Sequence, residues 1–219
     1  MGTLYIVATP IGNLDDITYR AVKTLSSVDL VLCEDTRHTG LLMQKLNIAT
    51  PLQAYYDEIE DKKIPEVIDA LTHGRNIALV SDAGTPLISD PGYRLVRECI
   101  KRNIPIVSIP GPSALLAALT SSGLPPHAFH FYGYPPEKQT ARLKLFQTLA
   151  GTCIFYCAPH KLVATLRDMH DVLGDITIVI ARELTKVHEE IWRGTLTQAS
   201  EHFTSPQGEF VLAFTITAR

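Results

Sequence analysis

Residues 77–92 read IALVSDAGTPLISDPG, and this stretch decides the fold. Its first four residues are apolar, whereas the remainder is rich in glycine, proline and short polar side chains. Such a run predicts a buried strand that ends in a loop, and the amphipathic segment from Pro91 to Lys101 predicts a helix after it. A strand, a loop and a helix in this order are typical of the βαβ units that build parallel sheets.

The same order recurs on either side of this stretch. Three further apolar runs predict strands at 4–8, 29–33 and 104–109. Amphipathic segments between them predict helices at 18–25, around 41–46 and at 64–71. The alternation predicts an α/β fold whose N-terminal sheet is mostly parallel, with helices on both faces.

The pattern changes after Pro110-Gly111-Pro112. Further strands are predicted at 129–132, 153–157, 176–181, 189–193 and 209–217, and further helices at 113–120, 139–149 and 161–173. The last two strands are candidates for an antiparallel pair, which gives this half a mixed sheet. We therefore expect two α/β domains, 1–112 and 113–219.

Composition narrows the class of protein. The chain has 219 residues, a net charge of −3 and 46% hydrophobic residues, which excludes disordered chains and a basic coat for gripping nucleic acid. No apolar run approaches the roughly 20 residues that span a bilayer, and the N-terminus lacks a signal-peptide pattern. None of the four cysteines forms a Cys-x-x-Cys pair, so we expect buried thiols, no metal site and a reducing, cytoplasmic compartment.

Glycine and proline gather in the loops that follow three of the predicted strands: 9–13, 81–92 and 110–113. In an open α/β sheet, ligands bind beyond the carboxyl ends of the strands, and glycine lets the backbone approach them closely. For any single loop, a plain turn is the alternative. The chain has no Gly-x-Gly-x-x-Gly and no P-loop motif, which argues against the usual nicotinamide and ATP enzymes.

Several motifs in these loops and beyond them resemble one known family. They lie, in order along nearly the whole chain, at 4–14, 33–37, 80–92, 109–114, 131–136, 181–190 and 208–210. Together they resemble the ribosomal RNA small subunit methyltransferase I family of the tetrapyrrole methylase superfamily. The long Ser-Asp-Ala-Gly-Thr-Pro segment beginning at Ser81 is the most specific of them.

The resemblance implies a two-domain tetrapyrrole-methylase-like fold with S-adenosylmethionine in the cleft between the domains. It implies methyl transfer to the ribose 2′-hydroxyl of a cytidine in the decoding region of 16S rRNA, with free rRNA or the 30S subunit as partner. It also implies a homodimer. By position, the cofactor contacts would be Pro10, Asp82, Ala83, Gly84, Thr85, Ile88, Pro112, Ser113, Tyr132 and Gly133.

The matched motifs also supply candidates for the chemical step. A ribose hydroxyl is a weak nucleophile, so a positioned base or a nearby cation would assist it. The candidates are Lys186, Asp35, Arg37 and Glu190, with Glu189 beside the last. Lys186 could orient or deprotonate the hydroxyl, and Arg37 could clamp a phosphate. The alternatives are helix capping for Asp35 and solvated surface charge for the others.

RNA contacts are harder to locate. Basic side chains cluster at Lys138, Arg142 and Lys144 and at His160-Lys161, although scattered charges are usually only solvated. The aromatic rings of Phe131, Tyr132 and Tyr134 could stack on an extruded base or pack locally.

Two other functions stay open. One is a methyltransferase for a porphyrinoid such as a precorrin or uroporphyrinogen, although the loops at 9–13 and 82–86 depart from the Gly-rich and Gly-Asp-Pro segments of those enzymes. The other is a non-catalytic module that binds the cofactor or RNA. Members of the resembled family usually carry a further small helical C-terminal domain, which we expect to be absent from this chain.

Overall fold

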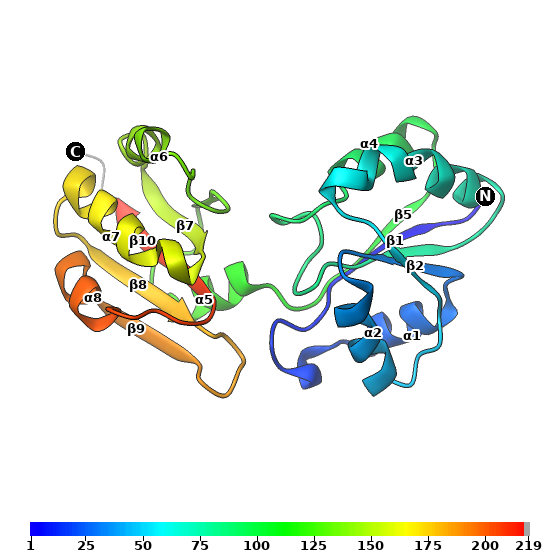
Figure 1. Cartoon of the computed structure of the whole chain (residues 1–219), viewed down its shortest axis with the longest axis horizontal. Helices are drawn as coiled ribbons and strands as arrows, with labels where there is room; N and C mark the ends of the chain where they lie inside the picture. The colour runs from blue at the N-terminus through cyan, green and yellow to red at the C-terminus, as the bar shows by residue number, and fades with distance from the viewer. Residues whose placement is uncertain (217–219) are drawn as a thin grey trace. The chain divides into compact units, whose positions relative to one another are not determined.

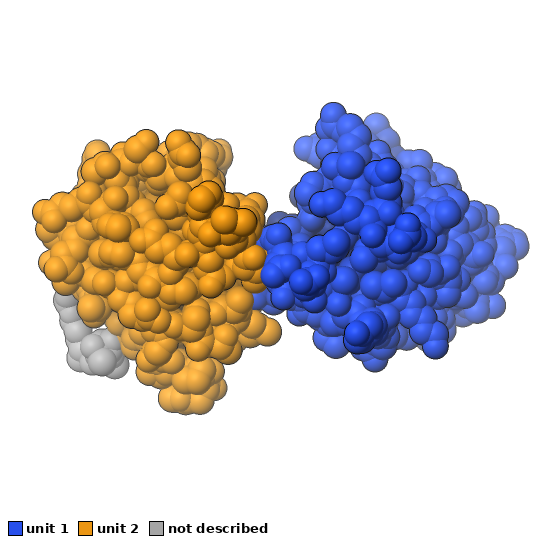
Figure 2. Space-filling model, turned by 90° about the horizontal axis from the view of Figure 1, so that it is seen from below, with its two compact units in different colours: residues 1–113 blue, residues 114–219 orange. Residues whose placement is uncertain are grey.

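The computed structural model describes residues 1–216 and divides the chain into two compact units, Met1–Ser113 and Ala114–Arg219 (Figure 2). Within residues 1–216, no helix is long and apolar enough to cross a membrane. All four cysteines are buried free thiols, as their apolar surroundings predicted.

The first unit is built on a five-stranded parallel sheet with the order β3-β2-β4-β1-β5. Its strands are β1 (Leu4–Val7), β2 (Leu30–Cys33), β3 (Leu52–Ala54), β4 (Ile77–Leu79) and β5 (Ile106–Ile109). Its helices are the short 3₁₀ helix η1 (Leu14–Asp16), α1 (Tyr19–Ser27), α2 (Thr36–Lys45), α3 (Asp57–Thr72) and α4 (Tyr93–Lys101).

Helices cover both faces of this sheet, as predicted (Figure 1). On one face, Leu25 of α1 and Met43 of α2 share a buried cluster with Val31 of β2. On the other, Leu71 of α3 and Leu95 of α4 pack with strand residues of β1, β2 and β4. Strands buried on both sides explain the continuous apolar runs that the sequence shows.

Two features of this unit escaped the sequence patterns. Strand β3 has only three residues, too few to show a period. Helix α3 begins at Asp57 rather than at residue 64, so Pro65 lies inside the helix and not in its first turn. Asp57, Glu58 and Glu60 occupy that first turn, where carboxylates stabilise the helix dipole.

The second unit contains a mixed sheet with the order β6-β7-β10-β8-β9, which confirms the predicted sheet type. Only the β6–β7 pair is parallel. The strands are β6 (Phe129–Phe131), β7 (Gly151–Cys157), β8 (Thr177–Arg182), β9 (Glu190–Thr195) and β10 (Phe210–Ile216). The helices are α5 (Ala114–Ser122), α6 (Gln139–Phe146), α7 (Pro159–Leu173) and α8 (Leu196–His202).

The predicted pairing of the last two strands is wrong. Strand β10 lies between β7 and β8, and β9 pairs with β8. The burial of the strands explains this order, because five residues of β10 are fully buried whereas β9 is only half-buried, as suits an edge strand. Residue 217, which the predicted strand included, lies outside the described residues.

Helix α8 was also missed, although its sequence carries a start signal. Thr195 accepts a hydrogen bond from the backbone N–H of Gln198, and the Gln198 side chain accepts one from the N–H of Thr195. This reciprocal pair is a capping box, which can be recognised from a Thr followed by a Gln three residues later.

Gly92 shows how tightly the long loop after β4 is packed. Its φ is +121°, and a Cβ there would lie 2.5 Å from Leu79 Cδ2 and 3.2 Å from Leu87 Cδ1. Both a strained backbone and an overfilled core would therefore oppose any side chain at this position.

We expect Gly92→Ala to lower the free energy of unfolding by roughly 2–4 kcal/mol, as measured by chemical denaturation. Gly74→Ala is the matched control, since Gly74 also has a positive φ (+91°) but nothing lies within 4 Å of its Cβ position. Backbone strain alone should cost the control about 1 kcal/mol. Equal losses in the two variants would contradict the packing argument.

Candidate functional site

The loops that follow β1, β4 and β5 are joined into one surface at the carboxyl edge of the first sheet. Thr9 and Gly84 exchange two backbone hydrogen bonds, with N···O distances of 2.9 and 3.1 Å. The Thr9 hydroxyl donates to the Ser81 carbonyl (3.2 Å), and the Thr85 hydroxyl donates to the Pro112 carbonyl (3.1 Å). The predicted cofactor contacts of this unit therefore lie on neighbouring segments of one surface.

Close packing and unusual backbone conformations accompany these bonds. Gly84 has a φ of +82°, and a Cβ there would lie 3.3 Å from Ile11 Cγ2. Leu87 and Ser89 also have positive φ values, 72° and 69°, which are uncommon for residues with side chains. Such conformations persist where the surrounding structure enforces them, and they gather at ligand sites.

Carboxylates crowd the same edge. The Asp35 backbone N–H donates to Asp82 Oδ1 (3.2 Å), and the Asp82 N–H donates to Glu34 Oε1 (3.4 Å). Burial raises the pKa of Glu34, and burial together with the charge of Glu34 raises the pKa of Asp90 to about 7. Among residues 1–216, no basic side chain forms an ion pair with Glu34, Asp82 or Asp90.

The sequence indicated Asp82 but not Glu34 or Asp90. Both lie in motifs that the sequence analysis singled out, directly after β2 and within the loop after β4. Adjacent parallel strands bring such positions together, so the β2–β4 pairing was the missing information.

Asp35 and Arg37 are engaged with each other. The Asp35 carboxylate caps α2 by accepting from the Arg37 backbone N–H (2.8 Å), and it also pairs with the Arg37 guanidinium at 3.1 and 2.7 Å. These hydrogen bonds hold the pKa of Asp35 well below its usual range. Asp35 is therefore a weak base, whereas the Arg37 side chain remains 89% exposed and can still meet an anion.

Lys186 lies in the second unit and is held by two carboxylates. Its Nζ is 2.9 Å from Glu183 Oε1 and 3.0 Å from Glu209 Oε2. Burial alone would lower the pKa of Lys186, but the hydrogen bonds to Glu183 and Glu209 outweigh it and raise that pKa. Lys186 is therefore an ammonium group, which can orient or stabilise a neighbour but cannot accept its proton.

The two carboxylate partners of Lys186 were not among the sequence candidates. Glu183 is three residues away along the chain, which is a spacing visible in the sequence. Glu209 reaches Lys186 because β8 and β10 pair with Arg182 opposite Phe210, and this register is not visible in the sequence.

The turn that carries Lys186 is strained. Glu183 and Thr185 have φ values of 50° and 66°, and a β-branched residue such as Thr185 rarely adopts this region. The Thr185 hydroxyl is buried and has no hydrogen-bond partner among the described residues. Gly208 makes room for the turn, because a Cβ there would lie 2.5 Å from Glu183 Oε1.

Glu189 and Glu190 have partners other than Lys186. Glu189 accepts the backbone N–H of Thr185. Glu190, the first residue of β9, is 3.6 Å from Arg182 and 2.7 Å from His202 Nε2. The structure therefore brings Glu190 together with a different set of charges from those around Lys186.

The aromatic rings after β6 differ in their surroundings. Tyr132 stacks on Phe155 at 4.9 Å, and Phe131 packs edge-on against Tyr156 at 4.8 Å, so these two rings are used in local packing. Gly133 has a φ of +65°, and its carbonyl accepts from the Tyr156 N–H (2.9 Å). Tyr134 also packs edge-on against Tyr156 (5.7 Å), but it remains 58% exposed.

Arg142 does not belong to an exposed basic cluster. Its side chain is buried, and its guanidinium pairs with the buried carboxylate of Asp168, with an Nε···Oδ2 distance of 2.7 Å. Arg142 therefore stabilises the fold and is not an RNA contact. The basic cluster expected at Lys138, Arg142 and Lys144 is reduced to the two lysines.

Comparisons with known proteins agree on the family. Residues 3–200 match the family model described as Tetrapyrrole (Corrin/Porphyrin) Methylases. Among solved structures, a diphthine synthase covers the whole chain with a TM-score of 0.76 at 13% identity. A uroporphyrin-III C-methyltransferase from Thermus thermophilus, solved in complex with S-adenyl homocysteine, covers 97% of it with a TM-score of 0.67 at 17% identity. At these identities the likeness shows the fold alone.

Sequence relatives are much closer. A Synechocystis protein named ribosomal RNA small subunit methyltransferase I is 53% identical over 218 residues, which is 97% of this chain and 78% of the relative. A Thermotoga maritima protein with the same name is 45% identical over 216 residues, which is 97% of each. The chain therefore belongs to the ribosomal RNA small subunit methyltransferase I family and, with it, to the tetrapyrrole methylases.

Proposed function

We propose that this protein transfers a methyl group from S-adenosylmethionine to the ribose 2′-hydroxyl of a cytidine in the decoding region of 16S rRNA, within free rRNA or the 30S subunit. The observation that carries the proposal is the 45–53% identity, over nearly the whole chain, to relatives named for methylation of small-subunit rRNA. The family resemblance stated above supplies the nucleotide and the 2′-oxygen, and it also supports a cytoplasmic homodimer.

The first unit has features that fit the cofactor. S-adenosylmethionine supplies a methyl group bound to a positively charged sulfur, and its methionine end adds an ammonium group. The carboxylates of Glu34, Asp82 and Asp90 lack a basic partner within the described residues, so a cationic ligand would balance their charge. Beside them, the absence of a side chain at Gly84 lets the buried backbone of this loop lie close to Ile11.

The remaining predicted contacts of this unit surround Gly84. Thr85 is hydrogen-bonded to the carbonyl of Pro112, and Ser113 is the next residue along the chain. Pro10 follows Thr9, which is bonded to Gly84. We propose that Pro10, the segment 82–85, Ile88, Pro112 and Ser113 line the cofactor through backbone and apolar contacts.

On the acceptor side, we assign Lys186 to the ribose hydroxyl. As an ammonium group fixed by Glu183 and Glu209, it would lower the pKa of a nearby hydroxyl and stabilise negative charge on its oxygen. Most of the rate acceleration would come from holding the oxygen, the methyl carbon and the sulfur in line. The turn around Lys186 holds Glu183 and Thr185 at positive φ, a conformation that persists where the surrounding structure enforces it.

Porphyrinoid methylation is the second candidate activity. Two of the similar solved structures are of a uroporphyrin-III C-methyltransferase, but at 17% identity they show only the shared fold. The much higher identity to rRNA methyltransferases favours RNA.

We expect the purified protein to transfer the labelled methyl group of S-adenosylmethionine to small subunits or 16S rRNA that lack the modification. Nuclease digestion followed by mass spectrometry should locate the label on the ribose of one cytidine. Uroporphyrinogen III, offered in parallel, should remain unlabelled. Transfer to the porphyrinoid and not to RNA would reverse the assignment, and cofactor binding without any transfer would indicate a non-catalytic module.

Replacing Lys186 tests its role at the acceptor. We expect Lys186→Met to lower kcat by roughly 100-fold, because a fixed cation near the developing charge is lost. Calorimetry should show an unchanged affinity for S-adenosylmethionine. Lys45→Met, which removes an exposed lysine on α2, is the control and should retain full activity. Methylation by Lys186→Met at the wild-type rate would contradict a role of Lys186 at the acceptor hydroxyl.

Asp90 gives a pH-dependent prediction. Its carboxyl ionises near pH 4 in the unfolded chain but at about pH 7 in the folded protein, so between these values only the folded state keeps the proton. The free energy of unfolding therefore falls as the pH rises from about 4 to about 7, because the folded protein loses the proton that it binds more tightly than the unfolded chain does. Asp90→Asn removes the titration, and the difference between its melting temperature and that of wild type should shift in favour of the variant by roughly 5–10 °C from pH 5 to pH 7.5.

Differential scanning calorimetry without cofactor would make this measurement. Asp16→Asn, which removes an exposed carboxylate on η1, serves as the control for a general change in net charge. If the difference in melting temperature between Asp90→Asn and wild type is the same at both pH values, Asp90 is already ionised in the folded protein at pH 5.

A further inference from the structure

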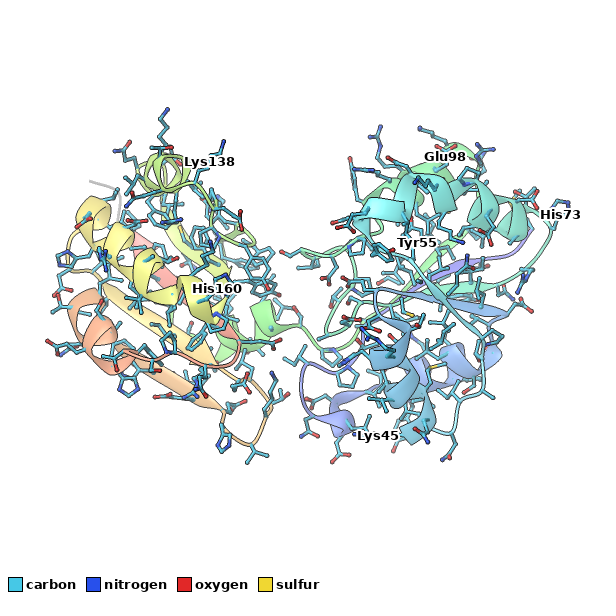
Figure 3. All side chains as sticks on the ribbon, in the orientation of Figure 1. Lys45, Tyr55, His73, Glu98, Lys138 and His160 are labelled. Carbon is cyan, nitrogen blue, oxygen red and sulfur yellow. The ribbon has the colours of Figure 1, made fainter. Side chains whose placement is uncertain are left out.

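A cavity of about 140 Å³ lies within the second unit. It opens where the segment after β6 meets the end of β7 and the beginning of α7. Its walls are formed mainly by Tyr134, Pro135, Pro136 and Ala158. The buried residues Cys157 and Thr165 lie deeper, as does Arg142, whose charge is paired with Asp168. His160 is exposed and Lys161 is half-buried, so these two lining residues lie at the rim. Figure 3 shows His160 at the beginning of α7.

We propose that this cavity binds a single-ring nucleobase of the RNA substrate, with the phosphate of the same nucleotide at the rim. The inference rests on the proposed function, because it takes RNA as the substrate. It adds a base-binding subsite in the second unit, on the segment that directly follows the expected cofactor contacts Tyr132 and Gly133.

Size and wall chemistry support a planar ring. A cavity of about 150 Å³ in a protein core holds a benzene molecule, so a volume of about 140 Å³ suits one six-membered ring better than a purine. Proteins that read unpaired RNA stack its bases on aromatic side chains. Here Tyr134 offers such a surface, and its edge-on contact with Tyr156 (5.7 Å) fixes the orientation of the ring.

Hydrogen bonds within the protein hold the Pro135-Pro136 wall of the cavity in position without a ligand. Arg142 Nη1 donates to the carbonyls of Pro136 (3.0 Å) and Glu137 (3.1 Å), and its other nitrogens bind Asp168. Gln139 Nε2 donates to the other oxygen of Asp168 (2.7 Å). This buried network satisfies its own charges and holds the Pro-Pro segment in place, so binding would cost little reorganisation.

Polar groups are placed at two depths. The Cys157 thiol, 3.9 Å from the Thr165 hydroxyl, is buried, and burial raises its pKa to about 11, so it stays neutral. These neutral groups suit the amide edge of a base. At the rim, Lys161 and the start of the 15-residue helix α7 favour an anion, while Glu137 is the single carboxylate of the lining.

The test uses the full chain saturated with S-adenosylhomocysteine, so that added nucleotides cannot occupy the cofactor site. Saturation-transfer NMR would measure the binding of cytidine 5′-monophosphate, adenosine 5′-monophosphate and inorganic phosphate. We expect the cytidine nucleotide to bind at least fivefold more tightly than the other two.

Three variants locate the binding. Ala158→Leu fills the cavity and should weaken binding of the cytidine nucleotide at least tenfold, and Lys161→Ala should weaken it about threefold. Arg167→Ala removes an exposed charge from the same helix outside the cavity and should have no effect. If Ala158→Leu fails to fold, Tyr134→Ala, which removes an exposed wall, carries the same expectation.

The inference is overturned if the cytidine nucleotide binds no better than phosphate, or if the cavity variants bind it like wild type. Either result alongside normal methylation of rRNA leaves the proposed function standing. Nucleotide binding as expected, with no methyl transfer to rRNA, would instead remove the function and leave the subsite.

Discussion

The paired hydrogen bonds between Thr9 and Gly84 are the constraint on which the first unit's surface depends. Parallel strands bring their carboxyl ends to one edge but do not by themselves connect the loops that follow. The Thr9–Gly84 pair makes that connection, and the bond from Thr85 to Pro112 extends it to a third loop. Because Gly84 needs a positive φ and close approach to Ile11, the connection also explains why this loop carries glycine.

The two units differ in whether their clustered charged side chains have partners of opposite charge. In the first, Glu34, Asp82 and Asp90 gather without a basic partner in the described chain, and burial raises the pKa of two of them. In the second, the charge of Lys186 is surrounded by carboxylates that keep it protonated. A net charge of −3 is therefore the sum of local arrangements, and it excludes only an RNA partner bound through a uniformly basic surface.

Sequence patterns predicted the sheet types and most elements because burial on both faces leaves continuous apolar runs. They failed where the information is not local. The place of β10 between β7 and β8, and with it the contact of Glu209 with Lys186, depends on which strands compete for the centre of the sheet. Likewise, Arg142 looked like a surface charge until its partner, Asp168 on α7, was known.

The central position of β10 also sets an order for folding. All five strands of the first sheet lie within the first 109 residues, so that sheet can close while the rest of the chain is still being synthesised. The second sheet cannot, because β7 and β8 are both paired with a strand that begins at Phe210. Until that strand arrives, Glu209 is not beside Lys186, and a chain emerging from the ribosome can join its loops after β1, β4 and β5 long before Lys186 has both of its carboxylate partners.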